Sequence, residues 1–281
     1  MTRLARARYH PRVARTGSLS RLFGGWFRRP RIRPVRDEVW AWAVGEHPIF
    51  GGLDEEELSR LRTLTEAFLG RKRLDPVRGA ELTDELAVSI AAQACLPVLN
   101  RGLDWYRDWW TIIVTPSEFE FEQTEYDEAG VAHDVEDSAS GEIMPLGPIV
   151  LSTKDVEASG WCDGYNVVIH EMAHALDRRD GEMNGAPPLP QGMDPARWYE
   201  VFLSAFRNLS HRARSRASRR SLPMDSYALE SPEEFFAVAS ELFFETPSRL
   251  DRAYPHIYEQ LSLFYAQDPR RRERFRRGRG S

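Results

Sequence analysis

The segment from residue 166 to residue 178 constrains the fold more than any other part of the sequence. It reads NVVIHEMAHALDR, in which small alanines at 173 and 175 lie among larger apolar residues. This composition is typical of a buried helix. Gly181 and Asn184 follow it, and both are residue types that end helices and form turns. The segment is therefore predicted to be a buried helix that ends before Gly181.

Two histidines lie four residues apart in this predicted helix. Residues at that spacing share one helix face, with Cβ atoms about 5 to 6 Å apart, so His170 and His174 can direct ring nitrogens at one zinc ion. Glu171 lies beside the first histidine and is the candidate general base for a water that the metal activates. The alternative is a pair of core histidines satisfied by hydrogen bonds. The apolar surroundings favour a metal site, because a chance match at the surface more often has polar neighbours.

A catalytic zinc site needs a third protein ligand. No third histidine follows at the spacing found in metzincins, where this chain has Asp180. Glu234 is the best candidate, sixty residues after His174 at the start of a predicted helix, and Glu233 and Glu241 compete with it. Glu234 also has an alternative role, since Ser231 and Glu234 have the spacing of a helix capping box.

Further residues are candidates for supporting roles around the metal. Glu241 or Asp177 can accept a hydrogen bond from an imidazole that binds zinc, although either can also be an exposed carboxylate. Tyr227 precedes Glu234 by seven residues and can donate its hydroxyl to the oxyanion of a tetrahedral intermediate. A packed surface tyrosine is the alternative.

The rest of the chain shows both helical and strand-like patterns. Asp54 and Glu57 form a predicted capping box, and a second helix is predicted from Thr83 to about Pro97. Other predicted elements are strands at 109–114 and 149–151, helices at 195–209, from 231 and at 254–265, an acidic hairpin or active-site edge at 117–147, and a loop at 212–221.

Charge is distributed unevenly along the chain. Residues 1–36 contain eleven arginines and no acid, and residues 270–279 contain seven arginines and one glutamate. Residues 37–265 carry 20 basic and 41 acidic side chains. We interpret the two ends as solvated tails, although they can also contact nucleic acid, anionic lipid or the acidic body. The N-terminus lacks the apolar core of a secretory signal but is compatible with a mitochondrial presequence.

Membrane and disulfide-rich classes are excluded. No run approaches the roughly 18 apolar residues of a membrane span. The two cysteines, Cys95 and Cys162, are far apart and form no paired motif, which fits reduced thiols in a cytosol.

Taken together, these segments resemble the Mlc titration factor A family of zinc peptidases from about Trp40 to Pro269. The resemblance is carried by CLPVL at 95–99, GPIVL at 147–151, GYNVVIHEMAHALD at 164–177, YA at 227–228, SPEEFFAV at 231–238 and ELFF at 241–244. It implies His170, His174 and Glu234 as zinc ligands, Glu171 as catalytic base and Tyr227 as transition-state stabiliser. It also implies a cytoplasmic protein with aminopeptidase-like activity on peptides and, for the namesake, binding to the repressor Mlc. The Arg-rich ends depart from the family pattern and leave the partner and location open.

We therefore predict an α+β zincin-like domain with one zinc ion per chain, in which a sheet edge borders a cleft floored by the motif helix. The predicted divisions are tails at 1–36 and 270–281 and a domain at 37–269, with a helical subdomain at 37–105 and a catalytic part at 106–269. The rival interpretation is a regulatory protein that binds a transcriptional repressor and uses zinc only for its fold. Nucleic-acid binding through the tails ranks last.

Overall fold

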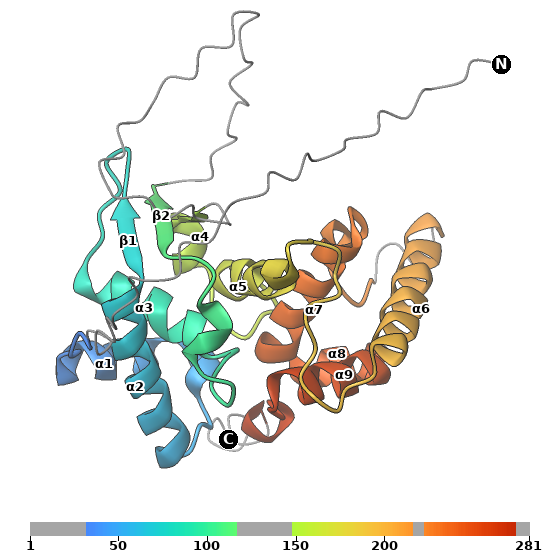
Figure 1. The fold of residues 1–281 in the computed structure, drawn as a ribbon, viewed down its shortest axis with the longest axis horizontal. Coiled ribbons are helices and arrows are strands. Elements are labelled where there is room, and N and C mark those ends of the chain that lie inside the picture. The colour runs from blue at the N-terminus through green and yellow to red at the C-terminus, as the bar shows by residue number, and fades with distance from the viewer. Residues whose placement is uncertain (1–31, 117–147, 216–221, 274–281) are drawn as a thin grey trace, which may run out of the picture.

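The structure, a computed structural model, describes residues 32–116, 148–215 and 222–273. It is rich in helices and contains one small sheet, which confirms the α+β class (Figure 1). The α-helices are α1 (Asp37–Glu46), α2 (Glu55–Arg71), α3 (Asp84–Cys95), α4 (Thr153–Glu157), α5 (Val167–Asp177), α6 (Pro195–Arg214), α7 (Pro232–Glu245), α8 (Pro247–Ala253) and α9 (Pro255–Tyr265). The described residues also form the 3-10 turns η1 (Pro48–Phe50), η2 (Leu103–Tyr106), η3 (Arg178–Asp180) and η5 (Ser226–Leu229).

The N-terminal helices begin where the sequence predicts. The Asp54 side chain accepts the N–H of Glu57, and the Glu57 carboxylate accepts the N–H of Asp54, which completes the predicted capping box of α2. Thr83 caps α3 by accepting the N–H of Leu86. Each such cap is worth about 1 kcal/mol because it satisfies backbone donors that a helix leaves unpaired. These helices pack against each other and join the main core.

The sheet has three parallel strands in the order β1-β2-β3. Its strands are β1 (Arg73–Pro76), β2 (Thr111–Thr115) and β3 (Ile149–Ser152). The strands predicted at 109–114 and 149–151 correspond to β2 and β3, whereas β1 is not predicted. The sequence RLDP of β1 offers no alternation of apolar residues and ends in proline, and β1 forms because it pairs with β2.

Parallel pairing requires a crossover connection. α3 and η2 lie in the crossover from β1 to β2, while the predicted hairpin or edge at 117–147 lies outside the described residues. β1 belongs to the predicted helical subdomain and β2 to the predicted catalytic part, so one sheet and one core cross the division between residues 105 and 106.

α5 lies at the centre of the molecule, between the N-terminal helices and α7 (Figure 1). It contacts α3, α7 and β3. Its residues Val168, Ile169, Met172 and Leu176 are fully buried, as predicted for this segment. A helix enclosed on these sides has little freedom to shift, which fixes the side chains that it carries.

An aromatic cluster holds α7 against α6 and α9. The rings of Trp198 and Phe202 stack with centroids 4.2 Å apart, and Trp198 also contacts Phe236 and Phe264. α6 continues to Arg214, so the predicted loop at 212–221 is wrong for its first residues, and residues 216–221 lie outside the described part. Basic residues in the last turn of α6 suit a helix C-terminus because they oppose its partial negative charge.

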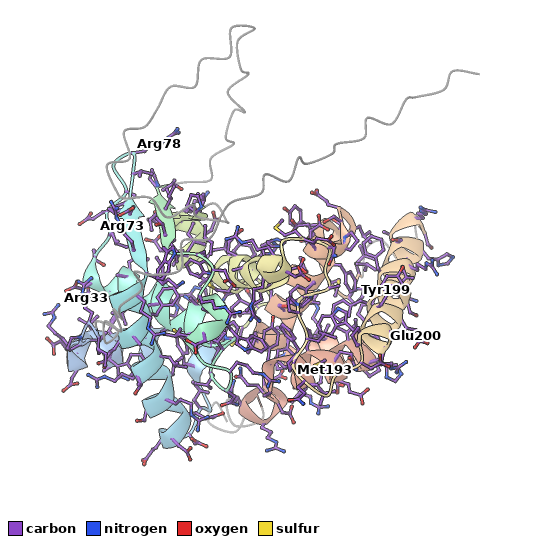
Figure 2. The ribbon with its side chains drawn as sticks, viewed as in Figure 1. Arg33, Arg73, Arg78, Met193, Tyr199 and Glu200 are labelled. Atoms are coloured by element: carbon purple, nitrogen blue, oxygen red, sulfur yellow. The ribbon has the colours of Figure 1, made fainter. Side chains whose placement is uncertain are left out.

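The described parts of the predicted tails pack on the body. Arg33 and Arg36 form ion pairs with Asp84, and the buried Arg272 donates to Glu57. Figure 2 places Arg33 beside the N-terminal helices, far from Tyr199 on α6. Residues 32–36 and 270–273 thus contact the acidic body, one of the partners considered for these tails. No helix in the described ranges combines the length and the apolar character needed to cross a membrane.

Candidate metal centre

The start of α5 is fixed by a single asparagine. Asn166 is fully buried, and its Oδ1 accepts the N–H of Ile169 at 2.9 Å as the N-cap of the helix. Its Nδ2 donates to Gln93 and to Glu245, each at 2.8 Å, and its backbone N–H donates to Glu241 at 2.6 Å. Every hydrogen-bonding group of this side chain therefore has a partner, which sets where α5 begins and how it is rotated.

α5 and α7 bring His170, His174 and Glu234 together. The two histidine Nε2 atoms are 3.1 Å apart, Nε2 of His170 is 3.1 Å from Oε2 of Glu234, and Nε2 of His174 is 3.4 Å from Oε1 of Glu234. Ligand atoms about 2.0 to 2.1 Å from a tetrahedral zinc ion are about 3.3 Å from one another. The three donors therefore have the separations of ligands on one tetrahedral ion.

Glu234 owes its orientation to the beginning of α7. Ser231 caps this helix by accepting the N–H of Glu234 at 3.3 Å. The Glu234 carboxylate faces the two imidazoles, so the capping box predicted as its alternative role is only half formed. Glu233 lies outside the group of ligand atoms that the described residues bring together.

Glu241 supports His170 from behind. Its Oε1 lies 2.9 Å from Nδ1 of His170, and its Oε2 accepts the N–H of Asn166. A carboxylate on Nδ1 fixes the ring so that Nε2 is left for a metal. Glu241 was one of the two carboxylates predicted as such a partner, and its hydrogen bond with His170 is present. Asp177, the other candidate, instead accepts the N–H groups of Asn184 and Gly185 through Oδ2.

A buried polar network continues from Glu241 toward the N-terminal helices. Asn166 links Glu241 to Gln93 of α3, Gln93 donates to Ser89, and Ser89 contacts Nε2 of His47 at 2.8 Å. These residues are far apart in the sequence, and no local pattern marks them. The only sequence signal available was a polar residue, Gln93, within the apolar run of α3.

Charges at the cluster favour a cation. Burial opposes ionisation of Glu234, but hydrogen bonds with His170 and His174 lower its pKa to about 2. Burial also opposes the charge on His170, yet hydrogen bonds to Glu234 and Glu241 raise its pKa to about 10. In both cases the surroundings stabilise positive charge beside the carboxylates. The same field stabilises a divalent cation at this position.

The donor set fits zinc. Two neutral imidazoles and one carboxylate match the His2Glu ligands of catalytic zinc sites, whereas calcium and magnesium prefer oxygen ligands alone. Nδ1 of His174 is buried without a hydrogen-bond partner among the described residues, which leaves its ring less constrained than that of His170. The cluster is also the only group among the described residues with suitably placed His, Cys, Asp or Glu ligand atoms.

A pocket of about 1070 Å³ opens onto the cluster. Its lining includes His170, Glu171 and Tyr227, together with Val150 and Ser152 of β3. Its volume is sufficient for a peptide of several residues, since drug-sized ligands occupy about 300 to 1000 Å³. The sheet and the motif helix thus border one cavity.

Glu171 and Tyr227 lie beside the candidate metal ligands. Burial raises the pKa of Glu171, and the nearby His170 and His174 oppose this change. The ring of Tyr227 lies 6.0 Å from that of His170, and its pKa is raised by burial and by the neighbouring Glu234. The tyrosine hydroxyl is therefore protonated at neutral pH and can donate a hydrogen bond. Tyr227 is 44% exposed, which makes it accessible to a ligand in the pocket.

Known proteins match most of this chain. Residues 25–266 match the family model described as Glucose-regulated metallo-peptidase M90. A protein from Escherichia coli strain 55989, named Mlc titration factor A, is 34% identical over 247 residues, which cover 83% of this chain and 93% of the relative. A protein of the same name from Cronobacter sakazakii is 34% identical over 229 residues, which cover 82% of this chain and 86% of the relative. The matched region includes both α5 and α7.

Proposed function

Because the chain belongs to the glucose-regulated metallopeptidase family M90, we propose that it is a zinc-dependent, aminopeptidase-like enzyme with a zincin-like active centre. One observation carries this proposal above the others. His170, His174 and Glu234 converge with the separations of ligands on one ion, and Glu171 lies beside them at the pocket. A site that only stabilised the fold would need neither the glutamate nor the open pocket.

In this proposal, His170, His174 and Glu234 hold one zinc ion per chain. Zinc bound there supplies a Lewis acid that polarises the substrate carbonyl and makes a water molecule acidic. Glu171 takes the proton of that water as it attacks the peptide carbon, and the raised pKa from burial suits this role at neutral pH. The same carboxyl then delivers the proton to the nitrogen of the leaving amine, which breaks the peptide bond.

Tyr227 has a separate role in the proposed reaction. Its hydroxyl donates a hydrogen bond to the oxyanion that forms when the carbonyl carbon becomes tetrahedral. Its exposure, its position in the pocket lining and its contact with the His170 ring support this role. We further propose a cytoplasmic location, which suits the two free cysteines, Cys95 and Cys162.

A second candidate function is regulatory. The relatives carry the name Mlc titration factor A, which favours binding to a transcriptional repressor with zinc serving only the fold. In that case Glu171→Ala would leave partner binding intact, and the wild-type protein would hydrolyse peptides no faster than a metal-free control. The presence of Glu171 next to both histidines favours the enzyme, because partner binding does not require a general base.

Hydrolysis of aminoacyl p-nitroanilides by the full-length, zinc-loaded protein tests the proposed function. We expect metal-dependent hydrolysis by the wild type and its loss in Glu171→Gln, with one zinc per chain in both proteins. Glu233→Gln is the matched control, because it removes a carboxylate that lies outside the ligand group. Full activity of a zinc-loaded Glu171→Gln protein would show that the assigned mechanism is wrong.

A further inference from the structure

The pocket that His170 and Glu171 line has an uneven distribution of charge. Apart from the proposed metal ligand His170, its lining includes one basic side chain, Arg249, and several acids. Arg249 is the third residue of α8, whose N-terminal end follows directly on α7. A single arginine in an acidic pocket would ordinarily pair with one of those acids.

Apart from Glu171, the proposed general base, the acids that line the pocket have hydrogen-bond partners elsewhere. Asp155 accepts the hydroxyl of Ser152 at 2.5 Å, and Asp163 accepts the N–H of Tyr165 at 3.0 Å. Asp225 accepts the N–H of Tyr227 at 2.8 Å. Each of these carboxylates therefore stabilises a turn or a helix start within a few residues of itself.

Glu241 is likewise occupied by His170 and Asn166, as described above. Within the described residues, the Arg249 guanidinium forms no ion pair, and its side chain is exposed. A guanidinium presents five N–H donors in a planar fork that matches a carboxylate. Among the described residues, Arg249 is therefore a charged donor at the pocket without an ion-pair partner.

The wall beneath Arg249 explains where its side chain lies. Gly164 has a φ of +111°, and a Cβ added there would lie 3.1 Å from Cδ2 of Leu242 and 3.5 Å from Nη1 of Arg249. The Arg249 guanidinium thus lies against the backbone of the turn that leads into α5. Leu242 and Gly164 also line the pocket, so this contact holds the guanidinium at the pocket wall rather than on an unrelated surface.

We propose that Arg249 is a specificity-determining residue that binds a carboxylate group of the peptide substrate. This inference rests on the proposed peptidase function and adds the class of substrate. The carboxylate comes either from the C-terminus of a short peptide or from an aspartate or glutamate side chain. The pair would be a bidentate, charge-assisted interaction, which is stronger than a neutral hydrogen bond.

Matched peptide pairs test this inference with the full-length, zinc-loaded protein. The first pair is trialanine with a free C-terminus and its C-terminal amide. In the second pair, both peptides have an amidated C-terminus, and one has glutamate where the other has glutamine at an internal position. We expect kcat/KM of the wild type to be about tenfold to hundredfold higher for the carboxylate member of one pair, from the strength of charged hydrogen bonds. The pair that shows the preference identifies the source of the carboxylate.

Substitutions then assign the preference to Arg249. We expect Arg249→Ala to bring the ratio within a pair close to one, and Arg249→Lys to keep part of it because charge remains without the planar fork. Arg252→Ala is the matched control, since Arg252 is an exposed arginine on the same helix outside the pocket lining. It changes the net charge equally and should keep the wild-type ratio.

Failure of this inference is distinct from failure of the proposed function. Hydrolysis without a carboxylate preference, or a preference that persists in Arg249→Ala, overturns the role of Arg249 alone. Absence of hydrolysis of every peptide overturns the proposed function. In that case, calorimetry measures the affinity of the zinc-loaded protein for each peptide of the same pairs. Equal affinity for the two members of both pairs overturns the role of Arg249.

Discussion

Glu241→Gln is the substitution whose effect follows most directly from the geometry of the metal centre. Two donors, Nδ1 of His170 and the N–H of Asn166, converge on the two oxygens of this buried carboxylate. Glutamine keeps the shape but has one acceptor oxygen, so one donor must face an NH2 group. The change therefore loosens either the metal ligand or the start of α5, and it removes a negative charge near the metal.

The expected size of this effect is a loss of metal affinity. Replacing an outer hydrogen-bond partner of a ligating histidine reduces affinity about 10- to 100-fold. That corresponds to about 1.4 to 2.8 kcal/mol of binding free energy. Competition of the protein with a chromogenic zinc chelator measures the dissociation constant of zinc. Thermal unfolding of the metal-free proteins checks that Glu241→Gln and its control variant are folded.

Glu233→Gln provides the control for this measurement. It removes a carboxylate from the same helix without touching His170 or Asn166. If folded Glu241→Gln and Glu233→Gln bind zinc equally well, the hydrogen bond to His170 does not orient a metal ligand. The account of how α5 and α7 build the site would then be wrong.

Three further outcomes are expected. Burial raises the pKa of Asp177 to about 6, so ionisation of its carboxyl group opposes folding. The free energy of unfolding of the wild type should therefore fall as pH rises from about 4 to above 6. Asp177→Asn should therefore gain about 3 kcal/mol of unfolding free energy relative to wild type across that range in urea titrations, and a pH-independent difference would contradict this. Gly185→Ala should destabilise the protein by at least about 2 kcal/mol, because its φ is +75° and the new Cβ would lie 2.4 Å from the Pro232 carbonyl oxygen. Gly192→Ala is the control for backbone strain alone, because Gly192 has a φ of +91° and an added Cβ would have no atom within 4 Å. Equal melting temperatures for Gly185→Ala and Gly192→Ala would refute the steric explanation. Tyr227→Phe should lower kcat about 100-fold while zinc affinity is kept, and an unchanged kcat would exclude the hydroxyl from oxyanion stabilisation.

The local part of the candidate metal centre could be predicted from the sequence. His170 and His174 meet because helical spacing places residues four apart on one face. The position of Glu234 could not be derived in this way, since it depends on how α7 packs against α5, a contact between segments far apart in the sequence. Spacing alone left Glu233 and Glu241 open, and the resemblance to the family selected Glu234. The structure brings Glu234 to the histidines and gives Glu241 the supporting position.

The fold was predictable where caps and periodic patterns are local. Helices α2, α3 and α7 begin at the predicted caps because Asp54, Thr83 and Ser231 each satisfy a nearby backbone N–H. Strand β1 was missed because its residues carry no strand pattern, and it exists through pairing with β2. The network from Gln93 through Asn166 to Glu241 also depends on contacts between distant segments, which single-sequence patterns do not encode.

Zinc content after Glu234→Ala tests the central claim most directly, because this residue completes the site from a distant helix. The wild-type protein should retain one zinc ion per chain after dialysis against a moderate chelator concentration, as should the control Glu233→Ala. Glu234→Ala, which keeps only His170 and His174, should lose its zinc under the same conditions while remaining folded. Full retention of zinc by folded Glu234→Ala would contradict the account and place the third ligand elsewhere in the chain.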